Sequence, residues 1–311
     1  MNILITGGAG FLGSALANRL THQGEHVRVL DDLSTSDSRV LLPEVHFARG
    51  DINDRPKLWT LLHEIDVVFH LAARVLVPES VLYPREYNTV NVSGTITLME
   101  AMRDVGVHRV VMVSSGAVYG DQGKQPLRED AIPNPRSPYA VSKLAAEWYV
   151  RTIGAQAKIE TVCLRVFNAY GPGQHIPPAH APVIPLFLRQ SAQNGTLVVH
   201  GDGNQTRDYV FVDDVVNAMV AAATASNVNQ AVINVGSGRE TNVRDLVRKV
   251  LEVTGGKPEI VFNTRTDAGV SRMCADLNLA GEKLNYQPQV SLEVGVRQTF
   301  DNDPLVGLHQ S

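Results

Sequence analysis

The segment from Ser137 to Lys143 places a tyrosine and a lysine four residues apart, at Tyr139 and Lys143. On a helix this spacing stacks the two side chains on one face. A free tyrosine loses its proton at about pH 10, too high for a base at neutral pH, but a nearby cation favours the phenolate and lowers this pKa. The pair could therefore act as a general base, although many helices carry Tyr and Lys at this spacing without a catalytic role.

A glycine-rich turn near the start of the chain could bind a pyrophosphate. Its glycines form a GxxGxxG pattern between an apolar run and a helical pattern. Glycines permit a tight turn and close backbone approach, and the N-terminus of the following helix supplies N–H donors. Such a turn can also bind nothing, but its place between a predicted strand and a predicted helix favours a dinucleotide. The expected cofactor contacts in this turn are Gly7, Gly10, Phe11, Leu12 and Gly13.

Two aspartates, Asp31 and Asp32, end the second predicted strand. A carboxylate at this point can accept hydrogen bonds from both adenosine ribose hydroxyls and would repel a 2′-phosphate, which favours NAD over NADP. The alternative for Asp31 is a helix cap or a turn residue.

Residues after the next two predicted strands suit the same cofactor. Asp51 and Ile52 follow the third strand, where an adenine edge would lie, and Leu71, Ala72 and Ala73 follow the fourth. Small alanines let the backbone pass close to a cofactor. His70, just before them, is by itself more typical of a structural histidine.

The elements that must position these residues alternate between short apolar runs and helical patterns. Several runs are apolar throughout, as strands buried on both faces should be. Repeated strand–helix units predict an α/β fold, a doubly wound parallel (Rossmann) sheet with helices on both faces. The predicted strands are Asn2–Thr6, His26–Leu30, Val45–Ala48, Val67–Leu71, Val110–Ser114 and Glu160–Val166. The predicted helices are Phe11–His22, Arg55–His63, Asn91–Asp104 and Tyr139–Gly154.

The second half of the chain changes in character after Tyr170. Residues 171–185 hold five prolines (172, 177, 178, 182 and 185), too many for a helix, and predict an ordered loop or a lid. Its part 175–182 could shape a pocket wall, but we favour a rigid loop. Beyond it we expect helices at Val183–Asn194 and Asp213–Ala225, a strand at Thr196–His200, and a strand at Ala231–Val235 that returns to the main sheet.

These patterns predict two interleaved domains. An NAD-binding Rossmann domain would comprise residues 1–167 and 209–236, and a smaller mixed α/β substrate domain would comprise residues 168–208 and 237–311.

Composition argues against several classes of partner. The net charge is -4 and no basic run indicates nucleic acid. No apolar run reaches membrane-spanning length, and no leader pattern precedes the first strand. The two cysteines, Cys163 and Cys274, have neither a disulfide framework nor metal-ligand spacing. We therefore expect a cytoplasmic protein that binds no metal.

Taken together, these motifs resemble the extended short-chain dehydrogenase/reductase family, and within it the nucleotide-sugar epimerase/dehydratase branch typified by UDP-galactose 4-epimerase. The resemblance covers nearly the whole chain. Its motifs are TGGxGFxG at 6–13, the Asp pair at 31–32, GDI at 50–52, HLAA at 70–73, NVxGT at 91–95, SSxxVYG at 114–120, YxxxK at 139–143, RxFNxYGPGQ at 165–174 and TRDYVFVDDV at 206–215.

The resemblance implies a role for each matching residue. Ser115 would hydrogen-bond the reacting sugar hydroxyl and Tyr139 would take its proton. Lys143 would bind the nicotinamide ribose and lower the tyrosine pKa. Asn168 would contact the substrate, and further implied contacts to the nucleotide sugar are Val183 and Val199.

Two arginines are candidates for the nucleotide diphosphate. The resemblance implies that Arg207 grips it, and a guanidinium offers the fixed donors that a phosphate needs. The alternative for Arg207 is a structural pair with Asp208 or Asp213. Arg272 could also reach phosphate, or it could be a surface cation.

The residues that follow Ser115 bear on the reaction. Dehydratases of this family carry an Asp-Glu pair here, and the decarboxylases carry a Glu before VYG, whereas this chain has Gly116 and Ala117. Neither can exchange a proton. The resemblance therefore favours NAD-dependent C4 epimerisation of a UDP-hexose through a 4-keto intermediate. The alternatives are a 4,6-dehydratase or UDP-glucuronate decarboxylase or 4-epimerase on the same fold, and, more remotely, a non-catalytic NAD-sensing protein.

Substrate size and assembly are also implied by the resemblance. Met273, three residues before Asp276, matches a gatekeeper that excludes N-acetyl sugars when it is a large Tyr, so N-acetylhexosamines fit as well as plain hexoses. The alignment is loose at 263–272, where Arg265 is the nearest match to an RxGD motif. The family resemblance also implies a homodimer through the helices Asn91–Asp104 and Tyr139–Gly154.

Overall fold

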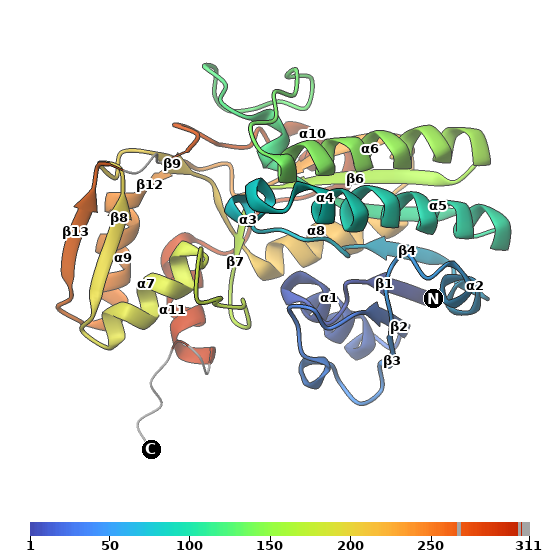
Figure 1. Cartoon of the computed structure of the whole chain (residues 1–311), viewed down its shortest axis with the longest axis horizontal. Coiled ribbons are helices and arrows are strands. Elements are labelled where there is room, and N and C mark those ends of the chain that lie inside the picture. Colours follow the sequence, from blue (N-terminus) through green and yellow to red (C-terminus); the bar gives the residue numbers. More distant parts are fainter. Residues whose placement is uncertain (266–268, 304–305, 307–311) are drawn as a thin grey trace.

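A seven-stranded parallel sheet forms the centre of the computed structural model, which describes residues 1–265, 269–303 and 306 (Figure 1). The strand order is β11-β6-β5-β4-β1-β2-β3, so the direction of winding reverses between β1 and β4. Ligands of such sheets bind beyond the carboxyl ends of the strands at this reversal. The strands are β1 (Asn2–Thr6), β2 (His26–Asp31), β3 (His46–Arg49), β4 (Val67–His70), β5 (Arg109–Ser115), β6 (Glu160–Val166) and β11 (Ala231–Val235).

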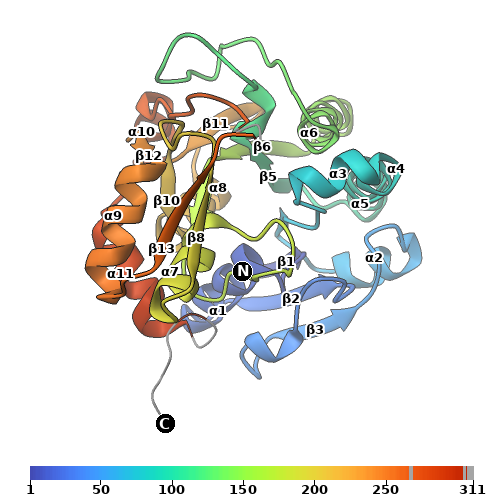
Figure 2. The same cartoon turned by 60° about the vertical axis from the view of Figure 1, so that its left-hand side comes forward.

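The sheet is buried on both faces, as its apolar strands predict. In β1, Ile3 and Ile5 join one apolar cluster while Leu4 joins another, because alternate side chains point to opposite faces. Helices cover both faces of the sheet (Figures 1 and 2). These helices are α1 (Phe11–His22) and α8 (Val212–Thr224) on the first face, and α2 (Arg55–Leu62), α5 (Gly94–Val105) and α6 (Pro138–Ala157) on the second.

A second lobe lies beside the carboxyl ends of the strands (Figure 2). The apolar core that includes buried side chains of α1 and α8 extends into this lobe, where buried residues such as Tyr170, Phe187 and Leu246 belong to it. The lobe's larger elements are α7 (Val183–Ala192), β8 (Thr196–His200), α9 (Val243–Thr254), β13 (Glu259–Asn263) and α11 (Leu292–Asn302). Helix α10 (Asn278–Leu284) contacts β11 and α8. Two small ladders pair β7 (Asn168–Tyr170) with β10 (Tyr209–Phe211), and β9 (Thr206–Arg207) with β12 (Thr241–Asn242).

Sequence patterns located the main sheet within one or two residues per strand, including the return of β11 beside β6. They missed two short helices, α3 (Val77–Leu82) and α4 (Pro84–Asn88). Each has a proline in its first turn, where proline is tolerated, but is too short to show a helical period. The helix predicted from Asn91 instead begins with a π-helical turn, Thr89–Ser93, before α5. No helix among the described residues is long and apolar enough to span a membrane.

Candidate active site

A cavity of about 470 Å³ opens at the carboxyl ends of the central strands. Every residue predicted to contact the cofactor lines it, and so does Ser115. These residues are Gly7, Gly10, Phe11, Leu12, Gly13, Asp31, Asp32, Asp51, Ile52, Leu71, Ala72, Ala73, Tyr139 and Lys143. Of the residues predicted to contact the nucleotide sugar, Ser115 and Tyr139 line the cavity, whereas the lining does not include Asn168, Val183, Val199, Arg207, Arg272 and Met273.

The glycine turn between β1 and α1 forms a cradle that side chains would fill. Gly7 has a φ of +70°, and a Cβ on it would lie 2.6 Å from the backbone nitrogen of Ala72. A Cβ on Gly13 would collide with the carbonyl oxygen of Gly7. Only glycine fits at both places, and α1 begins at once with Phe11. Bare backbone beside a helix N-terminus fits the pyrophosphate of NAD.

Asp31 lines this cavity and also holds the turn after β2. Its carboxylate accepts hydrogen bonds from the backbone N–H groups of Ala9 (3.0 Å) and Leu33 (2.9 Å) and from the Ser36 hydroxyl (2.8 Å). A carboxylate has about four acceptor positions, so roughly one remains for a ligand hydroxyl. Asp31 is therefore a turn residue and a cavity-lining residue at the same time.

His70 is a structural residue. Its Nδ1 lies 2.8 Å from the Thr6 hydroxyl and its Nε2 lies 2.8 Å from the Thr95 hydroxyl. The Thr95 hydroxyl donates to the Asn91 carbonyl, so it accepts from His70 Nε2. Burial, with the charge of Lys143 as a smaller cause, lowers the pKa of His70 to about 3. The imidazole is therefore neutral and fixed in one tautomer.

Helix α6 and strand β5 bring the three predicted catalytic side chains to one end of the cavity. Ser137 caps α6 by accepting a hydrogen bond from a first-turn backbone N–H at 3.2 Å. This start places Tyr139 and Lys143 on the cavity side, one turn apart and both buried. Ser115 ends β5, and its hydroxyl oxygen accepts from the backbone N–H of Ala117 at 3.1 Å.

The electrostatics of this group differ from the sequence-based prediction. Burial raises the pKa of Tyr139, and the hydrogen bond with Ser115 offsets only part of that rise. Burial also lowers the pKa of Lys143 to about 8. The pKa of Tyr139 therefore lies above its usual value in this structure, and the predicted lowering is not met, because the loss of hydration outweighs the hydrogen bond with Ser115.

Arg207 lies partly buried in β9. Its Nη1 donates to the carbonyl oxygens of Thr206 (2.7 Å) and Val270 (2.6 Å), and burial lowers its pKa. The two aspartates considered as structural partners bond elsewhere: Asp208 accepts from the backbone of Ser237, Gly238 and Ala275, and Asp213 faces Arg19 at 3.6 Å.

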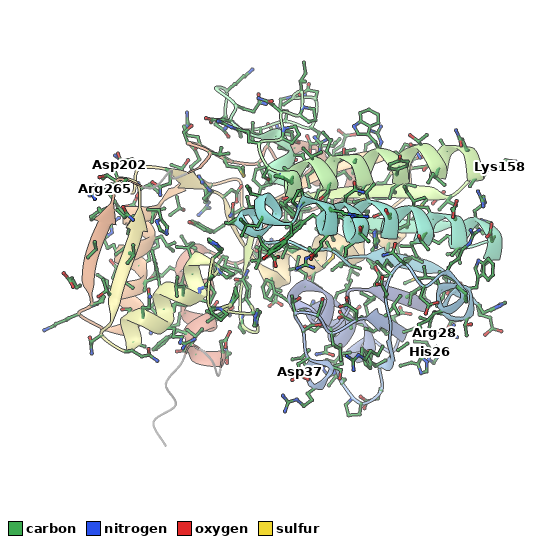
Figure 3. All side chains as sticks on the ribbon, viewed as in Figure 1. His26, Arg28, Asp37, Lys158, Asp202 and Arg265 are labelled. Carbon is green, nitrogen blue, oxygen red and sulfur yellow. The ribbon has the colours of Figure 1, made fainter. Side chains whose placement is uncertain are left out.

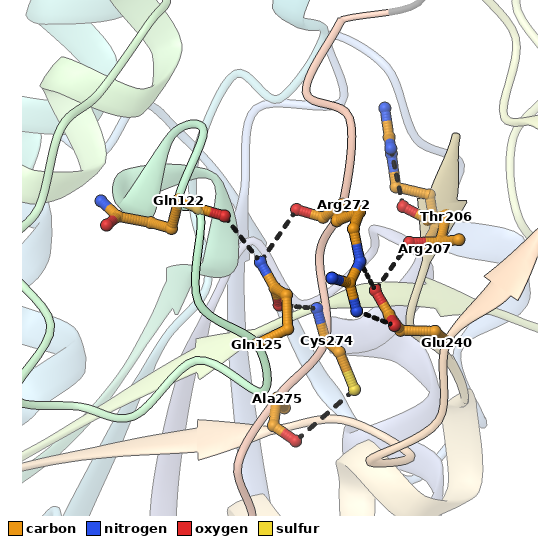
Figure 4. A network of polar contacts seen from close by, with 8 residues as sticks. All are labelled: Gln122, Gln125, Thr206, Arg207, Glu240, Arg272, Cys274 and Ala275. Carbon is orange, nitrogen blue, oxygen red and sulfur yellow. Dashed lines mark hydrogen bonds and ion pairs between the residues drawn. The ribbon is translucent and has the colours of Figure 1, made fainter. Parts of the chain in front are cut away.

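Arg272 is engaged in an ion pair with Glu240 at 2.6 Å (Figure 4). Gln125 lies beside it and ties the loop after β5 to this segment, since its Nε2 donates to the Arg272 carbonyl at 3.2 Å and its Oε1 accepts from the Cys274 N–H at 2.9 Å. Any phosphate contact of Arg272 would have to compete with Glu240.

Met273 is 7% exposed and packs in an apolar cluster that includes Tyr119 and Phe167. Phe167, in turn, lines the cavity. Arg265 is exposed at the outer end of β8 and β13, next to the turn of Asp202 (Figure 3). The rest of the loosely aligned RxGD region includes residues 266–268, which lie outside the described residues.

The proline-rich segment forms part of the cavity wall, which corrects the interpretation of it as only a rigid loop. Gln174, His175, Pro177 and Pro182 all line the cavity. Sequence analysis also missed Arg74 and Glu79, which line the cavity and pair at 2.9 Å. Arg74 directly follows the HLAA motif, a position that could have drawn attention to it. Among the described residues, no group of three or more His, Cys, Asp or Glu side chains could hold a metal ion.

Comparisons with known proteins agree with this geometry. The profile of the NAD dependent epimerase/dehydratase family matches residues 3–236. A UDP-glucose 4-epimerase of Mycolicibacterium smegmatis is 40% identical over 309 residues, covering 97% of this chain and 98% of that protein.

Two solved structures are similar over nearly their whole length. The UDP-glucose 4-epimerase of Thermotoga maritima with UDP-glucose has a TM-score of 0.92 and 36% identity, covering 96% of this chain and 97% of the other. The UDP-N-acetylglucosamine 4-epimerase of Methanobrevibacter ruminantium in complex with UDP-N-acetylmuramic acid has a TM-score of 0.91 and 30% identity, covering 96% of each chain. Because the family profile covers most of the chain and a relative is 40% identical over nearly its whole length, the chain belongs to the NAD dependent epimerase/dehydratase family.

Proposed function

We propose that this protein is an NAD-dependent 4-epimerase of UDP-hexoses, which interconverts UDP-glucose and UDP-galactose and also accepts N-acetyl forms. The observation that carries the proposal is the meeting of Ser115, Tyr139 and Lys143 at one end of the dinucleotide cavity, without a carboxylate at positions 116 and 117. The names of the similar proteins, UDP-glucose 4-epimerase and UDP-N-acetylglucosamine 4-epimerase, support it.

In the proposed mechanism, the Ser115 hydroxyl holds the C4 hydroxyl of the sugar beside Tyr139. Tyr139 takes the hydroxyl proton and gives it back at the end of the cycle. NAD, when bound, would supply the acceptor and later the donor of the C4 hydride, and a positively charged ring. Lys143 supplies a second positive charge, which favours the phenolate of Tyr139 against the burial that disfavours it. The keto sugar turns over in between, so that C4 is rebuilt with the opposite configuration.

The residues after Ser115 oppose elimination chemistry. A Cβ on Gly116 would lie 3.2 Å from the ring of Phe167, so any side chain there would press against this ring. Ala117 has no group that exchanges protons. Removal of water or of carbon dioxide therefore lacks the acids and bases that the dehydratases and decarboxylases of the family carry.

The substrate contacts belong to the same proposal. Arg207 would bind the diphosphate, with Arg272 as a second candidate, and Asn168 would contact the substrate. Val183 and Val199 would lie along the nucleotide sugar, and Met273 would limit the size of the sugar. Together with this division of tasks, we propose the two interleaved domains, residues 1–167 with 209–236 for NAD and residues 168–208 with 237–311 for the nucleotide sugar.

We also propose a cytoplasmic homodimer that pairs α5 and α6 of two copies. In support, α6 exposes Val141, Trp148 and Tyr149. Their spacing of seven and eight residues places them on one face of the helix.

A product assay tests the proposed reaction. The purified protein is given UDP-glucose, UDP-galactose, their N-acetyl forms and UDP-glucuronate, and the mass and configuration of each product are recorded. We expect a new isomer of unchanged mass from the hexoses. A product lighter by water or carbon dioxide would overturn the proposal. If only UDP-glucuronate were converted, the substrate would be a UDP-uronic acid and not a UDP-hexose.

A further inference from the structure

Gln174, in the loop between β7 and α7, has its side-chain amide fixed in one orientation. Its Nε2 donates a hydrogen bond to the carbonyl oxygen of Ala169 at 3.2 Å. A backbone carbonyl can only accept, so this bond decides which end of the amide is nitrogen and directs Oε1 the other way.

The Oε1 atom of Gln174 is a buried acceptor with no hydrogen-bond partner among the described residues. Buried polar atoms in proteins are nearly always paired, because an unpaired one loses its hydration without compensation. Gln174 lines the dinucleotide cavity. A ligand that brings a donor into this part of the cavity would satisfy the atom.

The position of Gln174 indicates which donor this is. Its hydrogen-bond partner Ala169 lines the cavity too and, with Phe167, follows β6, the strand paired with the one that ends in Ser115. Gln174 therefore lies toward the catalytic end, where the nicotinamide must meet the sugar. Apart from Ser115 and Tyr139, which meet the reacting carbon, the residues proposed to hold the nucleotide sugar do not line this cavity, whereas those for the dinucleotide do. At its nicotinamide end the dinucleotide carries one N–H donor group, the carboxamide.

We propose that Gln174 Oε1 accepts a hydrogen bond from the carboxamide N–H of NAD. The inference rests on the use of NAD in the proposed function and adds a positioning residue to it. A carboxamide held in this way fixes the rotation of the nicotinamide ring, and with it the ring face that meets C4 of the sugar.

The loop around Gln174 is built to hold this position. The backbone N–H of Gly173 donates to Asp303 Oδ2 at 2.9 Å, and Asp303 is fully buried. Pro177 and Pro182 restrict the backbone on the other side of Gln174. The acceptor is therefore positioned before a ligand binds, which reduces the entropy lost on binding.

Paired ligands and paired variants test the proposal. The dissociation constants of NAD, of UDP-glucose and of 3-acetylpyridine adenine dinucleotide, which carries a methyl ketone in place of the carboxamide, are measured by calorimetry on the full-length protein. We expect the wild type to prefer NAD by about tenfold, the scale of one buried hydrogen bond. Gln174→Met should remove this preference. Gln190→Met is the control, because the Oε1 of Gln190 is also buried and has no partner in the described part of the chain, but Gln190 lies on α7 and is not part of the cavity lining.

Each other outcome contradicts the inference in a recognisable way. If Gln174→Met weakens both dinucleotides equally, the side chain only packs against the wall. If the preference for NAD stays and only the affinity for UDP-glucose falls, Oε1 faces a sugar hydroxyl instead. If the wild type binds neither dinucleotide, it is the proposed NAD-dependent function that fails.

Discussion

Glu147 on α6 forms a buried ion pair with Arg165 on β6, with 2.7 Å between Oε1 and Nη2 and side-chain exposures of 1% and 5%. Glu147 lies one helical turn beyond Lys143 and also accepts a hydrogen bond from the Ser114 hydroxyl at 3.1 Å. The pair thus ties the helix that carries Tyr139 and Lys143 to the sheet that carries Ser115.

Removal of one partner of this pair should destabilise the fold strongly. Glu147→Gln leaves the Arg165 charge buried without compensation, so we expect the free energy of unfolding in urea to fall by about 3–5 kcal/mol. The double variant Glu147→Leu with Arg165→Met should recover most of this loss. Glu160→Gln is the control, since Glu160 pairs with Arg109 at the surface and should cost less than about 1 kcal/mol. If Glu147→Gln and Glu160→Gln lost the same free energy of unfolding, burial of the ion pair would not be what makes its removal costly.

Replacement of the proposed base should remove catalysis without loss of fold. Tyr139→Phe deletes one oxygen atom, and we expect kcat for UDP-glucose to fall by about 10²–10⁴-fold while the melting temperature changes little. Tyr149→Phe serves as the control, because Tyr149 lies exposed on the same helix. A Tyr139→Phe enzyme with wild-type kcat would exclude Tyr139 as the base.

The charge of Lys143 predicts an alkaline limit to activity. Its pKa is lowered to about 8 by burial, so the ammonium is present below that pH and is lost as pH rises through it. We expect kcat/KM to fall above about pH 8 because the cation beside Tyr139 disappears. Lys143→Arg keeps its charge over this range and should move the limit upward, whatever its effect on the maximal rate. An unchanged limit in the variant would assign it to another group.

The proposed dimer depends on the apolar face of α6. Trp148 is 56% exposed there, and Trp148→Glu should convert the dimer to a monomer in analytical ultracentrifugation. The chain's other tryptophan, Trp59 on α2, is 41% exposed, so Trp59→Glu is a matched control that should stay dimeric. A wild type that sediments as a monomer, or a Trp148→Glu variant that remains a dimer, would contradict the proposed interface.

Local sequence patterns predicted the strands and the glycine turn, because short-range interactions determine both. The parallel strands follow from apolar runs, and the cofactor cavity follows from Gly7 and Gly13, whose spacing leaves room for backbone alone. Residues predicted from these patterns do line one cavity.

The features that the sequence did not predict depend on contacts between distant segments. Arg272 pairs with Glu240, 32 residues away, and nothing in the sequence near either residue indicates this. The place of Gln174 depends on the path of a whole loop anchored at Asp303. The pKa of Tyr139 rises because neighbours from several elements bury it, whereas the spacing to Lys143 alone suggested the opposite.

His70 predicts how stability depends on pH. Its pKa is about 3 in the fold and 6.5 as a free side chain, so between these values the unfolded chain binds the additional proton. Stability from the neutral, buried imidazole is therefore complete above about pH 6.5 and falls as pH decreases, by up to about 5 kcal/mol at the lowest pH. In His70→Gln this dependence should be weaker between pH 6.5 and 4, even though the variant is less stable overall. His46→Gln, at an exposed site on β3, should keep the wild-type slope. Parallel curves for the wild type and His70→Gln would mean that other groups cause the loss of stability in acid.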